Sequence, residues 1–387
     1  MPTRRVDLND YTIDPRDLAA DAARVLAAGG IVALPTETVY GLAAKPDVPA
    51  AREALAKLRD GQTGPLTPHL AEPVELERFG IDPGEVGAKL ISKLWPGPVA
   101  IVFQQPDVTR REAAAKDLGV ETGDLFSSDG RITLRCPDDP FARLVANLAG
   151  QPMVLTRAGL PKAGEANRPP TVEALEPLGV DLLVDAGPAR YARASTVIRV
   201  APGGDGWEVV REGIYDRRIV ERLLRTNLLF LCSGNTCRSP MAMAIARKVL
   251  AEKLGTTVEG LGEKGFDVAS AGTGAMPGMR ATPAAADAVD ELGGDLRAHR
   301  SQPLDVASIH RADLIVAMGQ AHRETVLAMV PSAAEKTVLL DPKGDIEDPI
   351  GSSPEVYRRL ARQFEGLVRD RIEESNLLAD TGVAGRR

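Results

Sequence analysis

Cysteine, histidine and long apolar runs are all scarce in this chain of 387 residues, which has three cysteines and four histidines. Cys136, Cys232 and Cys237 are too few for a disulfide framework and are typical of a reducing compartment. The cysteines and histidines also lack the spacing of a zinc site, so we expect no metal. No apolar run is long enough to cross a bilayer, and the N-terminus lacks the apolar stretch of a signal peptide. We therefore expect a cytoplasmic protein with no membrane partner.

The common nucleotide-binding glycine loops are also missing. Neither GxxxxGK followed by Ser or Thr, nor GxGxxG after a predicted strand, occurs in the sequence, so any nucleotide site must be of another type. The net charge of −7 argues against broad, nonspecific nucleic-acid binding, although a local basic cleft remains open. With 44% hydrophobic and 26% charged residues the composition is globular, and the length suits two domains.

The best domain boundary lies near residues 221–227, because a complete strand–helix alternation begins after it. We expect a first domain at 10–222, a second at 227–377 and a flexible tail at 378–387. The first reads as an α+β twisted sheet with partly mixed strands, with helices at 15–28, 48–59 and 83–94, and strands at 31–34, 99–103, 132–134, 153–155, 181–184 and 196–200. The second alternates strands at 228–231, 266–269, 313–316 and 337–340 with helices at 239–254, 282–292, 320–328 and 354–375. This spacing predicts an α/β domain with a parallel sheet covered on both faces.

The most informative stretch is a loop between the first strand and first helix of the second domain. The apolar run 228–231 ends in Cys232, and Arg238 follows just before a helix-forming segment. Backbone N–H groups in such a loop converge on an anion, and the positive end of the next helix points there. The planar guanidinium of Arg238 can bind two phosphate oxygens, and the same positive field favours the Cys232 thiolate. The pattern predicts a phosphate site.

The alternative is a buried structural cysteine in an ordinary strand-to-helix turn. Three features of the loop argue against that interpretation. Gly234 and Asn235 tolerate the positive φ angles that a phosphate cradle needs. Ser239 can donate a hydrogen bond to the thiolate, and Pro240 falls in the first helical turn, where a missing N–H costs nothing.

Residues 227–375 resemble the low-molecular-weight protein tyrosine phosphatases. The string CSGNTCRSP at 232–240 matches their signature loop, SAGT at 270–273 and HRS at 299–301 match later segments, and DIEDP at 345–349 matches the loop of the general acid. The resemblance implies that Cys232 attacks phosphorus, Arg238 stabilises the oxygens and Asp348 is the general acid and base. It implies phosphorylated protein substrates and no cofactor. The remaining residues expected in the phosphate-binding loop are Ser233, Gly234, Asn235, Thr236, Cys237 and Ser239.

Position 236 separates subtypes of this family. Tyrosine-directed members usually have a larger aliphatic residue there, whereas the protein-arginine phosphatases have threonine, as this chain does. Ile350, after Asp348-Pro349, offers no aromatic clamp for a phenyl ring. Both features favour phosphoarginine over phosphotyrosine. The related arsenate reductases need further cysteines downstream, and none follows Cys237.

Residues 15–215 resemble the threonylcarbamoyl-AMP synthase family, whose fold is called YrdC-like. PTETVYGL at 35–42, KLR at 57–59, WPGP at 95–98 and REG at 211–213 carry the resemblance. The family joins ATP, taken with magnesium, to L-threonine and bicarbonate, and its product serves tRNA modification. The implied ATP-site residues are Lys57, Arg59, Thr156, Ser195 and Arg211, and those implied for threonine are Thr36, His69 and Arg135.

The first domain also departs from its family. The family triplet Ser-Ala-Asn appears as Thr156-Arg157-Ala158, and Ala100 replaces a threonine after WPGP. The basic residue usual after KxR is missing at 60–66. Three interpretations follow: a bifunctional enzyme, a phosphatase whose first domain only binds a nucleotide or RNA, and a scaffold with neither activity. The complete set of Cys232, Arg238 and Asp348 argues against the third.

Overall fold

The computed structural model describes residues 3–59, 64–157, 172–204 and 206–375. These residues divide into two compact units that meet at Leu223 and Leu224 in the sequence. Each unit is described separately below. Within the described residues, no helix combines the length and apolar character that a membrane span requires. The predicted tail at 378–387 lies outside the described residues.

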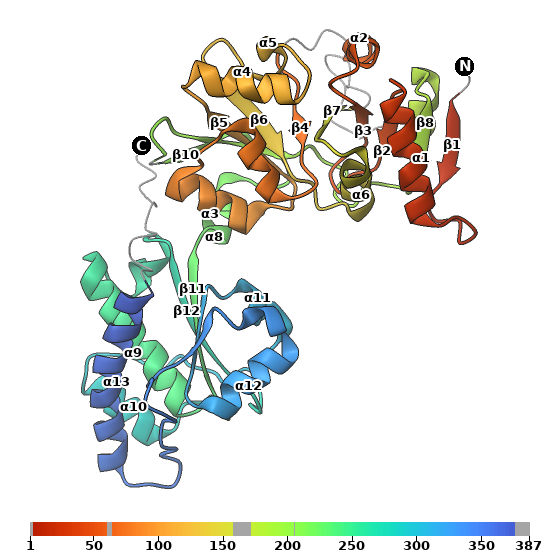
Figure 1. The fold of residues 1–387 in the computed structure, drawn as a ribbon. Coiled ribbons are helices and arrows are strands. Elements are labelled where there is room, and N and C mark those ends of the chain that lie inside the picture. The colour runs from red at the N-terminus through yellow and green to blue at the C-terminus, as the bar shows by residue number, and fades with distance from the viewer. Residues whose placement is uncertain (1–2, 60–63, 158–171, 205, 376–387) are drawn as a thin grey trace. The chain divides into compact units, whose positions relative to one another are not determined.

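The first unit is built on a 10-stranded mixed sheet with the order β1-β8-β2-β3-β7-β4-β6-β5-β9-β10 (Figure 1). Its strands are β1 (Arg4–Asp7), β2 (Val32–Leu34), β3 (Gly41–Ala44), β4 (Pro68–His69), β5 (Val99–Gln104), β6 (Arg131–Arg135), β7 (Met153–Arg157), β8 (Leu182–Asp185), β9 (Thr196–Val200) and β10 (Trp207–Arg211). β1 pairs in parallel with β8, so the sheet begins before residue 10, where the sequence placed the start of the domain.

Helices cover this sheet on both faces. They are α1 (Pro15–Ala27), α2 (Pro49–Leu58), α3 (Gly84–Leu94), α4 (Val108–Asp117), α5 (Thr122–Leu125), α6 (Pro140–Ala149), α7 (Val172–Leu175) and α8 (Arg217–Leu223), with 3-10 turns at Pro73–Phe79 and Glu176–Leu178. Alternate residues of β2 enter different cores: Val32 and Leu34 pack with α1 and α6, whereas Ala33 packs with α2. This alternation follows from the two-residue repeat of a strand.

The second unit has a four-stranded sheet with the order β12-β11-β13-β14, in which every pairing is parallel. Its strands are β11 (Thr226–Cys232), β12 (Phe266–Gly272), β13 (Leu314–Ala317) and β14 (Thr337–Leu339). Its helices are α9 (Arg238–Leu254), α10 (Pro283–Asp290), α11 (Val306–Arg311), α12 (Gln320–Met329) and α13 (Pro354–Glu374), with 3-10 turns at Glu259–Gly262 and Pro331–Ala333. The predicted parallel α/β architecture is confirmed.

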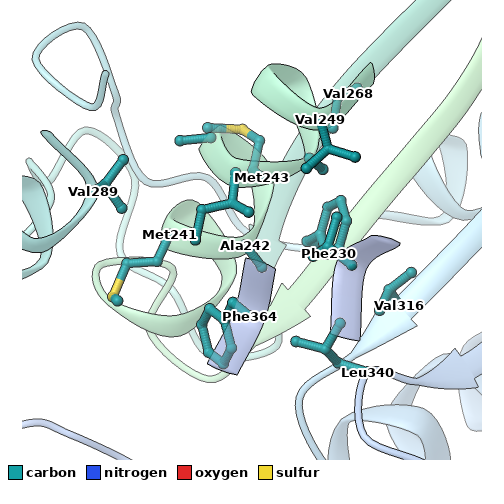
Figure 2. Close-up of a cluster of buried hydrophobic side chains, with 14 of the residues drawn as sticks. Phe230, Met241, Ala242, Met243, Val249, Val268, Val289, Val316, Leu340 and Phe364 are labelled. Atoms are coloured by element: carbon teal, nitrogen blue, oxygen red, sulfur yellow. The ribbon is translucent and has the colours of Figure 1, made fainter. Parts of the chain in front are cut away.

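Two apolar cores hold the sheet of the second unit between its helices. In Figure 1, α9, α10 and α13 lie on one face of this sheet and α11 and α12 on the other. Figure 2 shows the larger core, where Phe230 from β11 and Phe364 from α13 lie close to α9. The other core contains Leu229 and Leu231, the residues that alternate with Phe230. β11 is therefore buried on both faces, which fixes the position of Cys232 at its carboxyl end.

Candidate active sites

The cysteine and arginine of the predicted phosphate loop lie at the two ends of a tight turn. β11 ends at Cys232, and α9 begins at Arg238. The backbone N–H of Asn235 approaches the Cys232 sulfur at 3.3 Å, and the Ser239 hydroxyl lies 3.0 Å from that sulfur. Ser233 and Gly234 are exposed at the tip of the turn, and Thr236 is half-buried. The Asn235 N–H therefore donates toward a buried sulfur, and the Ser239 hydroxyl lies within hydrogen-bond distance of the same atom.

Asn235 holds this turn together. It is fully buried and has a φ of 53°, in the left-handed region that asparagine tolerates better than most residues. Its side-chain amide donates to Ser239 Oγ and to Ser270 Oγ, both at 2.9 Å. Its Oδ1 accepts from the backbone N–H of Gln302 at 2.9 Å. One side chain thus connects the loop, the first turn of α9, the end of β12 and the segment after residue 300.

His299 forms a further hydrogen bond with Asn235, to its backbone carbonyl oxygen. Its Nε2 lies 2.8 Å from the Asn235 carbonyl oxygen, which only accepts, so Nε2 carries the proton. Burial lowers the pKa of His299, and the hydrogen bond to Asn235 opposes that effect. Gly272 lies directly beneath the loop: a Cβ there would come within 2.4 Å of the Ser233 carbonyl oxygen. The loop therefore requires glycine at that place.

Arg238 and Asp348 form an ion pair at the edge of the loop. Arg238 Nη2 donates to Asp348 Oδ2 at 2.5 Å, and Nη1 donates to the Ile346 carbonyl at 3.1 Å. The arginine side chain is 9% exposed and the aspartate 45% exposed. The structure thus brings Cys232, Arg238 and Asp348 to one site, where Asp348 bonds to the arginine.

Cys237 faces away from the site. Its sulfur lies 3.5 Å from the Thr282 hydroxyl and 3.7 Å from the Tyr357 hydroxyl on α13. Thr236 Oγ1 is 3.7 Å from the same sulfur. Burial raises the pKa of Tyr357, and the hydrogen bond with Cys237 acts in the same direction. Tyr357 is therefore a protonated phenol at neutral pH, and Cys237 packs against three hydroxyls.

His322 is a residue of this site that the sequence analysis missed. It lies in the first turn of α12, and its Nε2 is 2.9 Å from the hydroxyl of Ser233 in the loop. No local pattern links the two, because 89 residues separate them. The parallel sheet brings them together, since β11 and β13 are neighbours and their carboxyl ends meet at the same edge.

The sequence-predicted residues of the first unit surround one cavity of about 310 Å³. Seven of the eight predicted residues line it: Thr36, Arg59, His69, Arg135, Thr156, Ser195 and Arg211. Three guanidinium groups and several hydroxyls give the cavity a positive, hydrogen-bonding wall suited to an anion. Thr133, Tyr40 and Ala194 also line it and were not singled out from the sequence.

Lys57 is the exception. It lies near the end of α2, its side chain is exposed, and it does not line the cavity as predicted. Residues two apart on a helix face different directions, so Lys57 points elsewhere when Arg59, just after the helix, reaches the cavity. Ala100 lines the wall where the family has a threonine. Ala158 and residues 60–63 lie outside the described residues.

A buried ion pair lies against this cavity. Arg135 Nη2 donates to Glu37 Oε1 at 2.7 Å and to Thr38 Oγ1 at 2.9 Å, with both charged side chains at most 6% exposed. Arg135 is thereby fixed in position beside His69. His69 Nδ1 donates to the Thr67 carbonyl at 3.0 Å, so the neutral ring leaves Nε2 as an acceptor. Burial and the neighbouring Arg135 lower the pKa of His69 to about 3.

Among the residues that the structure describes, neither site contains a metal-binding cluster. Within the described ranges, the His, Cys, Asp and Glu side chains form no group of three or more that could hold a metal ion. The cations at the two sites are Arg238 in the second unit, paired with Asp348, and Arg59, Arg135 and Arg211 in the first, where Arg135 is paired with Glu37.

A buried cysteine at the carboxyl end of a central parallel strand, followed by an arginine at a helix N-terminus, defines the class of cysteine-dependent phosphatases. The chain belongs to the low molecular weight phosphotyrosine protein phosphatase family, which residues 227–377 match. A protein-arginine-phosphatase of Bacillus subtilis is 34% identical over 37% of this chain and 92% of its own length. A probable low molecular weight protein-tyrosine-phosphatase of Ralstonia solanacearum is 36% identical over 36% of this chain and 83% of its own length.

The first unit has relatives of its own. Residues 24–213 match the Sua5_yciO_yrdC family, described as telomere recombination. A threonylcarbamoyl-AMP synthase of Bacillus subtilis is 30% identical over 52% of this chain. The chain spans 56% of the length of that synthase. The two predicted resemblances are thus confirmed for both parts of the chain.

The low pKa of His69 predicts an acid-sensitive first unit. The folded state holds the ring neutral down to about pH 3, whereas the unfolded chain takes up a proton near pH 6.5. The free energy of unfolding should therefore fall as pH drops below 6.5, by on the order of 1 kcal/mol per pH unit from this group. His69→Gln should remove that component. Both tryptophans, Trp95 and Trp207, lie in the first unit, so urea unfolding followed by tryptophan fluorescence measures it selectively.

The matched control is His310→Gln, because His310 is exposed on α11 of the second unit. The control should leave the pH dependence of the fluorescence transition as it is in the unaltered protein. Equal pH dependence in His69→Gln and the unaltered protein would contradict the assignment of a neutral, buried imidazole.

Proposed function

We propose that the second unit hydrolyses phosphorylated proteins through a phosphocysteine on Cys232, with phosphoarginine as the preferred substrate. The observation that carries the proposal is the buried Cys232 sulfur, which the Asn235 N–H and the Ser239 hydroxyl approach at 3.3 and 3.0 Å. Donors aimed at a sulfur stabilise the thiolate, the nucleophilic form. Arg238 at the N-terminus of α9 adds the positive charge that an incoming phosphoryl group requires.

The reaction proceeds in two displacements. The Cys232 thiolate attacks phosphorus, an S–P bond forms and the bond to the leaving group breaks, with a proton supplied by Asp348. Water then attacks the phosphocysteine, Asp348 takes its proton, and inorganic phosphate leaves as the thiolate is restored. The loop amides and Arg238 stabilise the charge on the phosphoryl oxygens in both steps.

The Arg238–Asp348 pair fits this scheme because a phosphoryl group can compete with the carboxylate for the guanidinium. Asp348 Oδ2 accepts a hydrogen bond from Nη2 of Arg238. The same Nη2 group would bind a phosphoryl oxygen of the substrate. A bound phosphoryl group carries more negative charge than one carboxylate, so it competes for the guanidinium and frees Asp348 for the leaving group. The 45% exposed Asp348 has room to make that move.

Overall identity does not choose between phosphoarginine and phosphotyrosine, because relatives named for each activity are 34% and 36% identical to this chain. Thr236 supplies the discriminating feature. Its hydroxyl lies 3.6 Å from the position that a Cβ on Gly234 would take and 3.7 Å from the Cys237 sulfur, so it belongs to the phosphate loop. A hydroxyl there suits a planar, hydrogen-bonding guanidinium better than a phenyl ring. Ile350 is 66% exposed and forms no apolar wall around Asp348.

Thr236→Ile should lower kcat/KM for a phosphoarginine peptide by roughly tenfold and spare or raise the value for the matching phosphotyrosine peptide. The physical reason is loss of the hydroxyl and gain of an apolar surface. The control is Thr236→Ser, which keeps the hydroxyl and should keep the preference for phosphoarginine. An unaltered protein that prefers phosphotyrosine, with a ratio that Thr236→Ile does not move, would contradict the proposed substrate.

For the first unit we propose a slow threonylcarbamoyl-AMP synthase. The supporting observation is the cavity whose wall combines Arg59, Arg135 and Arg211 with six hydroxyl-bearing side chains. The amine of threonine would attack the carbon of bicarbonate, and loss of water would give a carbamate, whose oxygen attacks the α-phosphorus of ATP and displaces pyrophosphate. Magnesium would enter with ATP as part of that substrate. Ala100 in the wall lacks the hydroxyl of the family threonine, and a lost polar contact to a charged ligand costs about 1–3 kcal/mol.

The competing function for this unit is binding of a nucleotide or RNA without catalysis, and pyrophosphate release separates the two. Incubation with ATP, threonine and bicarbonate should release pyrophosphate only when all three are present. Arg211→Ala should lower the rate at least tenfold, because it removes a cavity cation, whereas Lys57→Ala should have little effect. ATP binding without any pyrophosphate release would favour the binding module over the enzyme.

A further inference from the structure

His322 touches the phosphate loop from a separate part of the sheet. It is 7% exposed, and its Nε2 lies 2.9 Å from the hydroxyl of Ser233. Ser233 Oγ also lies 3.5 Å from Arg238 Nη2, the group that donates to Asp348. The imidazole is therefore connected through one hydroxyl to the guanidinium that would grip the phosphoryl group.

Both neutral tautomers of the ring are compatible with the contact between Nε2 and Ser233. Nδ1 is buried and has no hydrogen-bond partner among the described residues. Arg238 can only donate, so Ser233 Oγ accepts from it and keeps its own hydrogen for another acceptor. In the neutral ring with the proton on Nδ1, Nε2 is that acceptor. That tautomer gives a directed chain in which Arg238 donates to Ser233 and Ser233 donates to His322, whereas in the other neutral tautomer Nε2 donates to Ser233 Oγ.

The charges around the imidazole favour the neutral ring. Burial lowers the pKa of His322, and the Arg238 guanidinium acts in the same direction. Asp345, Asp348 and the Gly319 carbonyl oppose these effects, without overcoming them. Asp345 also accepts from the N–H of Gln320 at 2.8 Å, which attaches the Asp348 loop to the first turn of α12.

We propose that His322 is a positioning residue of the phosphatase: as a neutral acceptor it orients the Ser233 hydroxyl, which in turn holds the Arg238 guanidinium when substrate displaces Asp348. The inference rests on the proposed phosphatase function. Without His322, Arg238 Nη1 still donates to the Ile346 carbonyl. The Ser233 hydroxyl, which accepts from Nη2, is then no longer oriented.

Protonation of His322 reverses the chain. Nε2 then carries a hydrogen and donates to Ser233 Oγ, so the serine hydrogen turns away, and a second cation faces Arg238. Because the pKa of His322 lies below its ordinary value of 6.5, the neutral, productive form predominates at neutral pH and is lost as the solution becomes acidic.

The test compares His322→Ala and His322→Gln with the unaltered chain, using para-nitrophenyl phosphate from pH 4.5 to 8. At pH 7.5, His322→Ala should lower kcat/KM by roughly tenfold, about the value of one hydrogen bond in the transition state. His322→Gln should recover most of that loss, because its amide reaches the position of Nε2. The control His310→Ala, on the exposed face of α11, should match the unaltered chain.

The pH profile carries the decisive readout. The ratio of kcat/KM for His322→Gln to that of the unaltered chain should be flat above pH 6.5 and should rise below it, because glutamine does not titrate. Taking the ratio removes the ionisations of Cys232 and of the substrate. A ratio that is flat at every pH, or full activity in His322→Ala, would overturn the proposal. Ser233→Ala alone should lower kcat/KM as much as the double variant Ser233→Ala with His322→Ala, which would show that the two residues act as a unit. Additive losses in the double variant would overturn the proposal.

The ¹⁵N chemical shifts of His322 report the direction of its hydrogen bond independently of phosphatase activity. With only four histidines in the chain, ¹⁵N spectra of single variants can assign His322. A proton on Nδ1 at pH 7.5 supports the directed chain, and a proton on Nε2 overturns it. That result is independent of turnover, so an unaltered chain that hydrolyses no phosphate ester would reject the proposed function while the spectra still decide the direction of the hydrogen bond.

Discussion

The phosphate site of the second unit depends on one buried side chain held in an unusual backbone conformation. Asn235 adopts a φ of 53°, which turns the backbone so that its own N–H points at the Cys232 sulfur. Hydrogen bonds of its side chain to Ser239, Ser270 and Gln302 stabilise that conformation, and His299 donates to its backbone carbonyl. Removing any one partner would leave a buried polar group unsatisfied, at a cost of about 1–3 kcal/mol.

The segments that contact Asn235 come from distant parts of the chain, and the parallel sheet brings them together. β11, β12 and β13 end at the same edge, which is where parallel α/β sheets bind their ligands. Cys232 and Ser270 thereby become neighbours, and α12 delivers His322 to Ser233. The glycine at 272 allows the closest approach, since any Cβ there would meet the loop backbone.

The sequence predicted the loop well because its chemistry is local. Cys232, Asn235, Arg238 and Ser239 lie within one strand-to-helix turn, and their spacing indicates an anion site. The contact of His322 with the loop could not be predicted in this way, because it depends on which strands are neighbours in the sheet. The Arg238–Asp348 ion pair was missed for a related reason: the sequence assigns roles to both residues but does not show that they bond to each other.

In the first unit, too, features with a local sequence pattern were predicted, and features that depend on tertiary structure were not. The strands predicted at 31–34, 99–103 and 196–200 were visible from their apolar runs and correspond to β2, β5 and β9, whereas β3 and α6 were missed. β3 is four residues long and follows a loop rich in threonine, so it carries little periodicity. Arg59 and Lys57 looked equivalent in the sequence, and only the end of α2 shows that one of them reaches the cavity.

The central claim, that Cys232 carries the phosphoryl group, is tested most directly by trapping the intermediate. The chain would be mixed with para-nitrophenyl phosphate, quenched within milliseconds and analysed by peptide mass spectrometry, with Asp348→Ala used to slow the hydrolysis step. The account predicts one phosphoryl group on the peptide that contains Cys232, located on that sulfur, and a greater yield in Asp348→Ala. Turnover with no phosphoenzyme, or a phosphoryl group on His299 or His322 instead, would contradict it.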